Sequence, residues 1–371
     1  MARLRDPSLL LALTGLGIDG GIASVSRCVA RAVDEEIHAG RIARSDRVLL
    51  LEDPARAAAP PVRGEQRLAR GSQVRFVWQT WQTYRSYRHD LVFFDLVGLA
   101  RSILLPLPAF PPRRCAIFVH GFELGAALGS SRTRALAQAR WLLANSEYTA
   151  ERLRAEHPAL ADRIRVVPLC IDPALIDAWE ASALEPPSPR EPAALIVGRM
   201  VAEEPGKGHD ALIAAWPEVR RRVPGVELWV VGGGNDVERL RARARESVAD
   251  GAVRFLGRVP DAELGSLYGR ASLFAMPSRQ EGFGLVYAEA MWHGLPCIGS
   301  TADAAGCVIE DGETGLLVPY GDVPAIAEAV ATLLGDSDRA RRMGQAGRLR
   351  ARQHFTYDRF RSDLLRALEL E

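Results

Sequence analysis

One segment, residues 273–291, has the sequence LFAMPSRQEGFGLVYAEAM. It predicts a short buried strand over residues 273–275, an open turn around Gly282 and Gly284, and a helix that starts at Leu285. A continuous apolar strand followed by a helix is typical of a parallel sheet that helices cover on both faces. The loops that follow such strands bind the ligand, and a helix N-terminus there can hold an anion.

The same unit recurs along the whole chain. Strands are expected at 9–13, 47–51, 91–94, 116–119, 141–144 and 164–167, and again at 194–197, 227–231, 253–256, 273–275, 296–298 and 315–318. Helices are expected at 22–33, 148–156, 207–223, 237–249, 261–270, 323–334 and 358–368. Twelve strands are too many for one doubly wound sheet of this length, and prolines cluster between residues 186 and 192. We therefore predict an α/β protein with two Rossmann-like domains, residues 1–172 and 193–354, joined by a linker at 173–192.

The composition excludes several classes of protein. Of 371 residues, 48% are hydrophobic and 25% are charged, which argues against a disordered or fibrous chain. Lys and Arg number 47 and Asp and Glu 46, so no global positive field favours nucleic acid, and no nucleic-acid partner is expected. The five cysteines form no CxxC pair, which indicates reduced thiols in a cytoplasmic protein. No stretch is apolar enough to predict a membrane span.

A glycine-rich stretch, TGLGIDGG at residues 14–21, follows the first predicted strand. Its glycines satisfy the G-x-G-x-x-G pattern of dinucleotide-binding proteins (Gly15, Gly17 and Gly20). That interpretation needs a carboxylate about 20 residues further on. Glu52 and Asp53 follow Gly20 by more than 30 residues. The alternatives are a backbone at Gly20 and Gly21 that a diphosphate can approach closely, and a plain tight turn.

Ionisable side chains stand in three further loops that follow predicted strands. His120 could hydrogen-bond a sugar hydroxyl or move a proton, or it could be a satisfied polar residue. Arg199 and Lys207 precede a helix, where they could trap an anion or be two solvated cations. Glu281 and Glu289 are eight residues apart, and two carboxylates suit sugar hydroxyls, which need strong acceptors. The apolar neighbours of Glu289 argue against a solvated helix residue.

Taken together, these stretches resemble the family-four glycosyltransferases, which are retaining enzymes of the two-domain GT-B fold. The block E-x7-E formed by Glu281 and Glu289 is the signature of that family. Further matches follow in order at 20–21, 120–121, 145–148, 198–199 with 207–208, 230–234, 255–259 and 311–318. The resemblance covers nearly the whole chain and is densest in its second half.

The resemblance implies that the second domain binds a nucleotide diphosphate sugar. Arg199 and Lys207 would neutralise the diphosphate and stabilise it as the leaving group. Glu289 would accept from the ribose hydroxyls, and Glu281 would hold the donor sugar. The other donor-binding residues would be Arg258 and Val259 near the base, Phe283 and Gly284 beside the sugar, and Leu285 at the helix N-terminus.

For the first domain, the resemblance implies the acceptor side. Gly20 and Gly21 would lie near the diphosphate and His120 near the sugar, and a C-terminal helix over 355–371 would cross back to this domain, with the two sheets facing each other across a cleft. The reaction would be a front-face transfer in which the leaving phosphate takes the acceptor's proton, and Glu281 would not be a nucleophile. No metal and no cofactor are expected, because Arg199 and Lys207 replace the metal's charge.

Two departures from the family pattern stand out. The spacing from Arg199 to Lys207 is longer than the commonest family form. Cys307 stands where a Glu or a similar polar residue is frequent. Both departures concern contacts to donor or acceptor, and neither changes the class.

Residues 63–88 allow two interpretations that bear on the identity of the acceptor. The stretch combines one acid with six arginines, two tryptophans and two tyrosines (Arg63, Arg67, Arg70, Arg75, Arg85, Arg88, Trp78, Trp81, Tyr84 and Tyr87). One interpretation is a surface for a membrane or a lipid diphosphate. The other, slightly favoured, is an amphipathic helix that packs its aromatic side chains on the sheet and leaves its arginines in water.

The leading hypothesis is a cytoplasmic, metal-independent, retaining glycosyltransferase in bacterial surface-glycan assembly, such as polysaccharide or lipopolysaccharide synthesis. The form of the 120–123 segment is similar to mannosyltransferases, so GDP-mannose is favoured weakly over UDP-hexoses. The acceptor would be a glycan or a lipid-linked glycan, at the inner face of the membrane. The alternatives are an NAD-dependent oxidoreductase that uses Gly15–Gly20, and a non-catalytic protein that binds sugar nucleotides.

Overall fold

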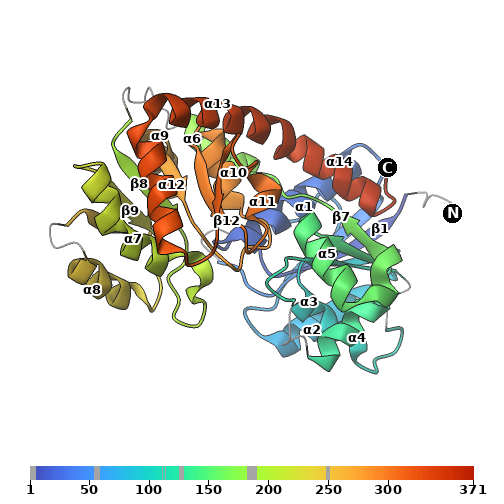
Figure 1. The fold of residues 1–371 in the computed structure, drawn as a ribbon. Helices are drawn as coiled ribbons and strands as arrows, with labels where there is room; N and C mark the ends of the chain where they lie inside the picture. The colour runs from blue at the N-terminus through green and yellow to red at the C-terminus, as the bar shows by residue number, and fades with distance from the viewer. Residues whose placement is uncertain are drawn as a thin grey trace. The chain divides into compact units, whose positions relative to one another are not determined.

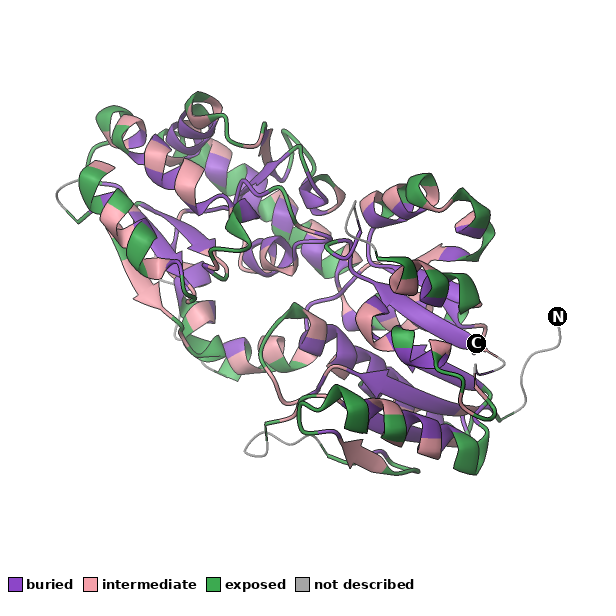
Figure 2. Cartoon of the chain, turned by 90° about the horizontal axis from the view of Figure 1, so that it is seen from below, coloured by how far each residue is buried: buried purple, intermediate pink, exposed green. Residues whose placement is uncertain are grey.

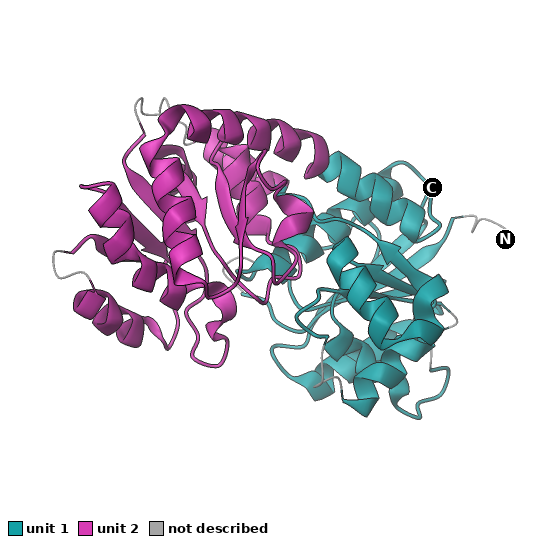
Figure 3. Cartoon of the chain, viewed as in Figure 1, with its two compact units in different colours: residues 1–172, 357–371 teal, residues 173–356 magenta. Residues whose placement is uncertain are grey.

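The chain forms two compact units, each built around one parallel sheet (Figure 3). The structure is a computed structural model, and it describes residues 6–53, 59–110, 112, 114–124, 129–181, 190–247 and 251–371. Unit 1 comprises Met1–Asp172 and Tyr357–Glu371, and unit 2 comprises Pro173–Thr356. None of the described helices is long and apolar enough to cross a bilayer.

Unit 1 contains a seven-stranded sheet in the order β3-β2-β1-β4-β5-β6-β7, with every neighbouring pair parallel. The strands are β1 Ser8–Leu13, β2 Arg44–Leu49, β3 Gln66–Leu68, β4 Leu91–Phe94, β5 Cys115–Val119, β6 Trp141–Ala144 and β7 Ile164–Val166. Strands β4, β5 and β6 are buried along their whole length (Figure 2). This explains why they appear in the sequence as continuous apolar runs without polar alternation.

Helices cover both faces of this sheet. They are α1 Gly21–His38, α2 Gln73–Tyr87, α3 Val97–Ala100, η2 Arg101–Leu104, α4 Ser130–Gln138, α5 Glu147–Glu156, η3 Pro158–Arg163 and α14 Tyr357–Ala367. Side chains of β1 such as Leu10 and Ala12 share one hydrophobic core with Phe76 and Tyr84 of α2. Helix α2 therefore covers this face of the sheet through hydrophobic contacts of its aromatic side chains.

Helix α14 completes the other face of unit 1 by packing on α1 (Figure 1). Arg361 of α14 bonds to Glu36, a buried residue of α1, and lies 3.1 Å from Glu35. The chain therefore returns to unit 1 at its C-terminus, with a helix that begins at Tyr357.

Unit 2 contains a six-stranded parallel sheet in the order β10-β9-β8-β11-β12-β13. The strands are β8 Ala193–Val197, β9 Glu227–Val231, β10 Val253–Gly257, β11 Leu273–Ala275, β12 Cys297–Ser300 and β13 Gly315–Val318. The helices are α6 Pro173–Ala181, η4 Pro205–Lys207, α7 His209–Arg222, α8 Val237–Ser247, α9 Asp261–Arg270, α10 Leu285–Trp292, α11 Ala305–Val308, α12 Val323–Gly335 and α13 Ser337–His354. The predicted fold class, two doubly wound α/β units with parallel sheets, is confirmed.

The segment predicted as a linker differs in part from that prediction. Residues 173–181 form α6, which packs on α9 through a hydrogen bond from the indole Nε1 of Trp179 to the carbonyl of Asp261, 3.0 Å away. Residues 182–189, which hold three of the prolines, lie outside the described residues. The proline cluster therefore follows a helix that was not predicted within the linker.

Both sheets reverse their strand order at a central strand. In unit 1 the reversal falls between β1 and β4, and in unit 2 between β8 and β11. In open parallel sheets, ligands bind beyond the carboxyl ends of the two strands that flank such a point, because their loops diverge there. The predicted site residues follow β1 and β5 in unit 1, and β8, β10 and β11 in unit 2.

A buried ionic cluster at β2 gives the fold a pH dependence. Asp46 is fully buried and accepts from Arg44 at 2.7 Å and His89 at 2.6 Å, which together with the amide of Glu65 lower its pKa to about 2 despite the opposing effect of burial. Since the pKa is near 4 when unfolded, the free energy of unfolding should lose about 2 kcal/mol as the pH falls from 5 to 2. Urea denaturation across this range checks it. Asp46→Asn should remove this part of the pH dependence, and an unchanged slope in that variant would contradict the assignment.

Candidate functional site

The loop after β8 carries Arg199 and is fixed along the loop after β9. The amide of Gly198 donates to Val231 and that of Met200 to Gly233, both at 3.0 Å. A side chain at Gly232 would lie 1.9 Å from the carbonyl oxygen of Gly198, and φ is +131° there. The glycines after β9 therefore permit a close approach of two backbones, which holds the start of the Arg199 loop at the sheet edge.

Lys207 is positioned by the two glycines that flank it. A Cβ atom at Gly206 would meet the side-chain oxygen of Gln280 at 2.6 Å, and one at Gly208 would meet the carbonyl of Pro277 at 2.5 Å. The amide of Arg279 also donates to the carbonyl of Gly206 at 2.8 Å. The Lys207 turn thus lies against the loop that follows β11, although the two are some 70 residues apart in the sequence.

Each of the two predicted cations has a carboxylate partner. Lys207 Nζ forms an ion pair with Glu281, and both side chains are mostly buried. Arg199 pairs with Glu204 at 2.9 Å, and both of these side chains are exposed. The structure therefore brings Lys207 and Glu281 together, whereas Arg199 is held by a residue that the sequence reasoning did not single out.

The Arg199–Glu204 pair predicts a variant that binds an anion more tightly. Glu204→Gln removes a competing carboxylate from Arg199, and since exposed pairs contribute about 0.2–1 kcal/mol, the affinity for a nucleoside diphosphate should rise up to about fivefold. Titration calorimetry measures the change. Glu203→Gln is the matched control, because Glu203 lies on the same loop but accepts from Asn235 at 3.1 Å. Equal gains in both variants would indicate a general charge effect and contradict a specific role of Glu204.

The turn and helix after β11 have the predicted form. Gly284 has φ +91°, a conformation that favours glycine, and a Cβ atom there would meet the Tyr287 ring at 2.4 Å. Phe283 is buried against Phe355, with ring centroids 5.7 Å apart. Helix α10 then starts at Leu285, so its first amides lie directly beyond the Glu281 turn.

Glu289 is not a solvated helix residue, since only 9% of its surface is exposed. The hydroxyl of Tyr268, a fully buried residue of α9, donates to its carboxylate at 2.9 Å. Burial and the nearby negative charge of Glu289 raise the pKa of Tyr268, so this hydroxyl keeps its proton and remains a donor. Glu289 is therefore held in one orientation from the side of α9.

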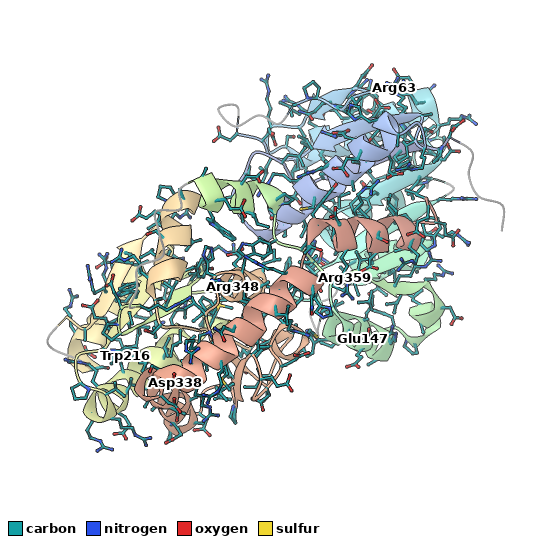
Figure 4. The ribbon with its side chains drawn as sticks, turned by 90° about the horizontal axis from the view of Figure 1, so that it is seen from above. Arg63, Glu147, Trp216, Asp338, Arg348 and Arg359 are labelled. Atoms are coloured by element: carbon teal, nitrogen blue, oxygen red, sulfur yellow. The ribbon has the colours of Figure 1, made fainter. Side chains whose placement is uncertain are left out.

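The C-terminal end of α10 is fixed by arginines. The backbone carbonyl of His293 accepts from Arg190 at 2.6 Å and from Arg348 of α13 at 2.9 Å; Arg348 is labelled in Figure 4. The His293 ring stacks on Tyr268 with centroids 5.4 Å apart. Cations at the C-terminal end of a helix are favoured by its dipole, so α10 and the carboxylate that it carries are rigidly placed.

The predicted base-binding residues follow β10. The side chain of Arg258 lies along Gly233, where an added Cβ atom would meet its Nε at 3.2 Å. Val259 is the next residue of the same loop. Arg258 is thus adjacent to the glycine loop that holds Gly198 and Met200, on the same sheet edge as Arg199.

In unit 1, the glycine loop is held by three side chains. The Glu52 carboxylate accepts from the amides of Leu16 and Gly17 at 3.0 and 3.1 Å. Asp95 accepts from the amide of Thr14 at 2.6 Å, and Arg27 donates to the carbonyl of Leu16 at 3.0 Å. The loop leads to Gly20, with φ +119°, and to Gly21, the first residue of α1. Glu52, the carboxylate considered for a dinucleotide ribose, is therefore engaged by the loop itself.

His120 follows β5 and lies largely buried between Phe118 and Phe122. Its Nε2 lies 2.8 Å from the carbonyl of Asp95, which can only accept, so Nε2 carries the proton and Nδ1 is the acceptor. Burial lowers its pKa to about 4, so the ring is neutral near pH 7. A neutral imidazole in this setting can accept a hydrogen bond from a hydroxyl.

The loop that carries His120 is held by a second buried acid. Glu123 accepts from the amide of His120 at 3.0 Å and from that of Val97 at 2.8 Å. Burial raises its pKa to about 7. Strand-end motifs could reveal His120, but other side chains that position the two sites, Asp95, Glu204 and Tyr268, carry no local signal beyond their polarity.

Comparisons with known proteins agree with this arrangement. A sequence profile described as Glycosyltransferase Family 4 matches residues 20–175, and one described as Glycosyl transferases group 1 matches residues 191–336. The chain belongs to the family-four glycosyltransferases. The first match contains Gly20, Gly21 and His120, and the second contains the whole Lys207–Glu289 region.

Curated relatives match parts of the chain. A GDP-mannose-dependent alpha-(1-6)-phosphatidylinositol monomannoside mannosyltransferase of Mycobacterium tuberculosis is 40% identical over 164 residues, which are 42% of this chain and 42% of that protein. A D-inositol 3-phosphate glycosyltransferase of Nocardia farcinica is 36% identical over 219 residues, 56% of this chain and 48% of that protein. The chain thus matches less than half the length of these relatives.

Solved structures match the fold over nearly the whole chain. Sucrose-phosphate synthase from Thermosynechococcus elongatus has a TM-score of 0.77 at 23% identity, covering 98% of this chain and 99% of that one. HepE from Anabaena, in complex with UDP and glucose, has a TM-score of 0.76 at 19% identity, with the same coverage. These likenesses establish the GT-B fold.

Proposed function

We propose that the protein is a retaining glycosyltransferase that moves a hexose from a nucleotide diphosphate sugar to a glycan or lipid-linked glycan. The observation that supports this best is the set of side chains at the β8/β11 reversal in unit 2. There Lys207 pairs with Glu281, Arg199 follows the adjoining strand, and Glu289 is held on α10. Two cations and two carboxylates at one sheet edge suit a ligand that carries both a diphosphate and hydroxyl groups.

In this proposal the chain's own residues carry the transfer. Lys207 and Arg199 bind the diphosphate and stabilise the charge that develops as the bond to the sugar breaks. Glu281 accepts from the sugar's hydroxyls and holds it for attack on the same face that the phosphate leaves. The leaving phosphate takes the acceptor's proton, so Glu281 forms no covalent bond to the sugar. Detection of a glycosylated Glu281 by mass spectrometry after rapid quenching would refute this step.

We favour GDP-mannose as the donor. The support is the relative from Mycobacterium tuberculosis, which is named as GDP-mannose-dependent and shares 40% identity over its matching segment. Titration calorimetry against GDP, UDP, ADP and NADH, without metal, tests donor and class together. Tightest binding of GDP is expected, preference for UDP would change the donor, and preference for NADH would overturn the class.

The same proposal includes a reaction without metal or other cofactor, because Lys207 and Arg199 supply positive charge at the diphosphate. Turnover should therefore persist in EDTA. Complete loss of turnover in EDTA, with recovery on adding Mg²⁺ or Mn²⁺, would show that the two cations are not sufficient.

For the acceptor side, we propose that unit 1 contacts an anionic membrane at the cytoplasmic face. Between Glu65 and Glu147 the chain has eleven arginines and three acidic residues. Two of those acids, Asp95 and Glu123, are buried. This part of the chain therefore carries an excess of positive charge although the whole chain is nearly neutral, and positive charge attracts anionic lipid headgroups.

Helix α2 adds exposed apolar side chains to this part of unit 1. Trp81 and Tyr84 are buried, as expected for an aromatic face that packs on the sheet, but Trp78 is 51% exposed and Val74 is 82% exposed. Leu105, in the segment that receives the Trp81 indole hydrogen bond at Pro108, is also exposed. Exposed Trp and aliphatic side chains next to arginines are typical of a surface that rests in the headgroup layer.

Co-sedimentation with vesicles tests this part. Vesicles with phosphatidylglycerol should bind the protein at low salt, neutral vesicles should not, and Trp78→Ala should weaken the binding. Leu349→Ala, which removes an exposed apolar side chain from α13 in unit 2, is the control. No binding to anionic vesicles at low salt, or equal loss in both variants, would remove the membrane from the proposal and leave the transferase activity untouched.

A further inference from the structure

A buried carboxylate that the sequence motifs did not single out lies against the Glu281 turn. Asp303, in the loop after β12, is 6% exposed. Its Oδ2 accepts from the Ser278 hydroxyl at 2.5 Å and from the amide of Glu281 at 3.0 Å, and its Oδ1 accepts from the amide of Ala305 at 3.0 Å. A carboxylate that takes three donors is a strong and directional anchor.

The contact between the two loops runs in both directions. The amide of Ala304 donates to the carbonyl of Glu281 at 3.1 Å. Residues 303 and 304 therefore hold the backbone of Glu281 at its nitrogen and at its oxygen. With both backbone groups fixed, the side chain of Glu281 leaves the chain at a set position, from which it reaches Lys207.

This arrangement bears on the departure at Cys307. That thiol stands where the family resemblance has a Glu or a similar polar residue, and a thiol is a weak acceptor. Its own amide donates to Ala304 at 2.9 Å, so Cys307 and Ala304 belong to one turn of backbone. The carboxylate present in this loop comes from Asp303, four residues earlier in the chain.

We propose that Asp303 is the positioning residue for Glu281, and that it sets the donor sugar, as distinct from the nucleotide, in place. The inference rests on the proposed role of Glu281 toward the donor sugar. Asp303 itself contacts the turn and not the reacting atoms. The residues proposed to bind the nucleotide, Lys207 and Glu289, lie on η4 and α10, and Lys207 is linked to the Asp303 anchor through its ion pair with Glu281.

The titration of Asp303 gives the proposal a distinctive signature. Burial, with a contribution from the negative charge of Glu281, raises the pKa of Asp303 to about 6. Two other ionisable groups lie nearby. One is Tyr287 of α10, whose pKa is raised by burial and by the negative charges of Asp303 and Glu281, and the other is Lys207, which pairs with Glu281. Protonation would place a hydrogen either on Oδ2, which accepts from Ser278 and Glu281, or on Oδ1, which accepts from Ala305. Either way the carboxyl group becomes a weaker acceptor, so the turn should loosen below about pH 6.

The test compares Asp303→Asn with the wild type in three measurements. These are the dissociation constant of the bare nucleoside diphosphate, kcat/KM for the nucleotide sugar, and the pH profile of kcat/KM. We expect affinity for the bare nucleotide to stay within about threefold, while kcat/KM falls by about tenfold or more. The wild-type limb near pH 6 should be absent from the variant. Ser278→Ala should show a weaker form of the same pattern.

Asp311→Asn is the matched control, because Asp311 also accepts from a backbone amide in unit 2, but that amide belongs to Leu317 of β13, 2.9 Å away, and not to the Glu281 turn. It should leave all three measurements unchanged. Equal loss of nucleotide and sugar binding in Asp303→Asn, or wild-type kcat/KM with an unchanged pH limb, would overturn the positioning role. If the wild type binds no nucleotide at all, the proposed function fails instead, so the two failures can be told apart.

Discussion

Replacement of Lys207 by alanine should weaken the binding of a nucleoside diphosphate by on the order of 2–4 kcal/mol, or roughly 30- to 1,000-fold. The side chain is mostly buried, so its charge acts through a medium that screens it less than water does. The substitution also leaves the carboxylate of Glu281 without this cation, at the place that a diphosphate would approach. Both effects have the same sign, which is why the expected loss is large.

Lys207 has a further property that sharpens the experiment. It is the single lysine in a chain with 46 arginines. An ammonium is a compact point charge, whereas a guanidinium is a planar fork, and the turn between Gly206 and Gly208 leaves little room beside Gln280 and Pro277. Lys207→Arg should therefore restore only part of the affinity.

The single lysine also allows a direct measurement of occupancy. An amine-selective reagent can modify Lys207 and the N-terminal amine, and peptide mapping separates the two. A bound nucleoside diphosphate should protect Lys207 and leave the terminal amine reactive. Arg241→Ala, which removes an exposed cation that pairs with Glu238 on α8, is the control for calorimetry. Unchanged affinity in Lys207→Ala, or no protection, would refute the diphosphate role.

The sequence predicted the strands of the sheets better than the helices that cover them, for a physical reason. Buried parallel strands are mostly apolar, and all twelve expected strands occur within three residues of their predicted ends. Strand β3, with the sequence QRL, escaped prediction because it is a short edge strand with no buried residue. A strand that buries neither face has no hydrophobic period to detect.

Helix α13 was also missed because its hydrophobic signal is weak. It spans Ser337–His354, and its buried positions are mostly small residues (Ala340, Met343, Gly344, Gly347 and Ala351). A Cβ atom at Gly344 would lie 2.1 Å from the carbonyl oxygen of Gly294, so the helix packs by close approach of backbones. Small residues bury little apolar area, so such a helix has a weak hydrophobic signal.

For the site, the sequence predicted the residues that face a ligand but not the residues that hold them in place. Motifs at strand ends point to the groups that face a ligand, such as Glu281 and Lys207, because topology alone sends those loops to one edge. They do not reveal which side chains hold those groups. Asp303 and Tyr268 reach Glu281 and Glu289 from 22 and 21 residues away. Such pairings depend on how the loops fold against each other, which no local pattern encodes.

The second large effect is expected at Glu289. Glu289→Gln keeps the shape of the side chain and removes its charge, so hydrogen bonds from the ribose hydroxyls would change from charge-assisted to neutral ones. Affinity for a ribonucleoside diphosphate should fall by about 1.5–3 kcal/mol, or roughly ten- to a hundredfold. Since Tyr268 can still donate to the amide oxygen of the variant, the fold of α9 against α10 should be retained.

A ligand change isolates the ribose contact. A 2′,3′-dideoxynucleoside diphosphate lacks both hydroxyls, so the wild type and Glu289→Gln should bind it with equal affinity. Tyr268→Phe should behave as a weaker version, because it loosens the orientation of Glu289 without removing the carboxylate. If Glu289→Gln weakens the dideoxy and ribose ligands equally, then Glu289 supports the helix and not the ribose. In that case only Glu281 of the E-x7-E block would contact the ligand, and its ion-pair partner Lys207 would bind the diphosphate beside it.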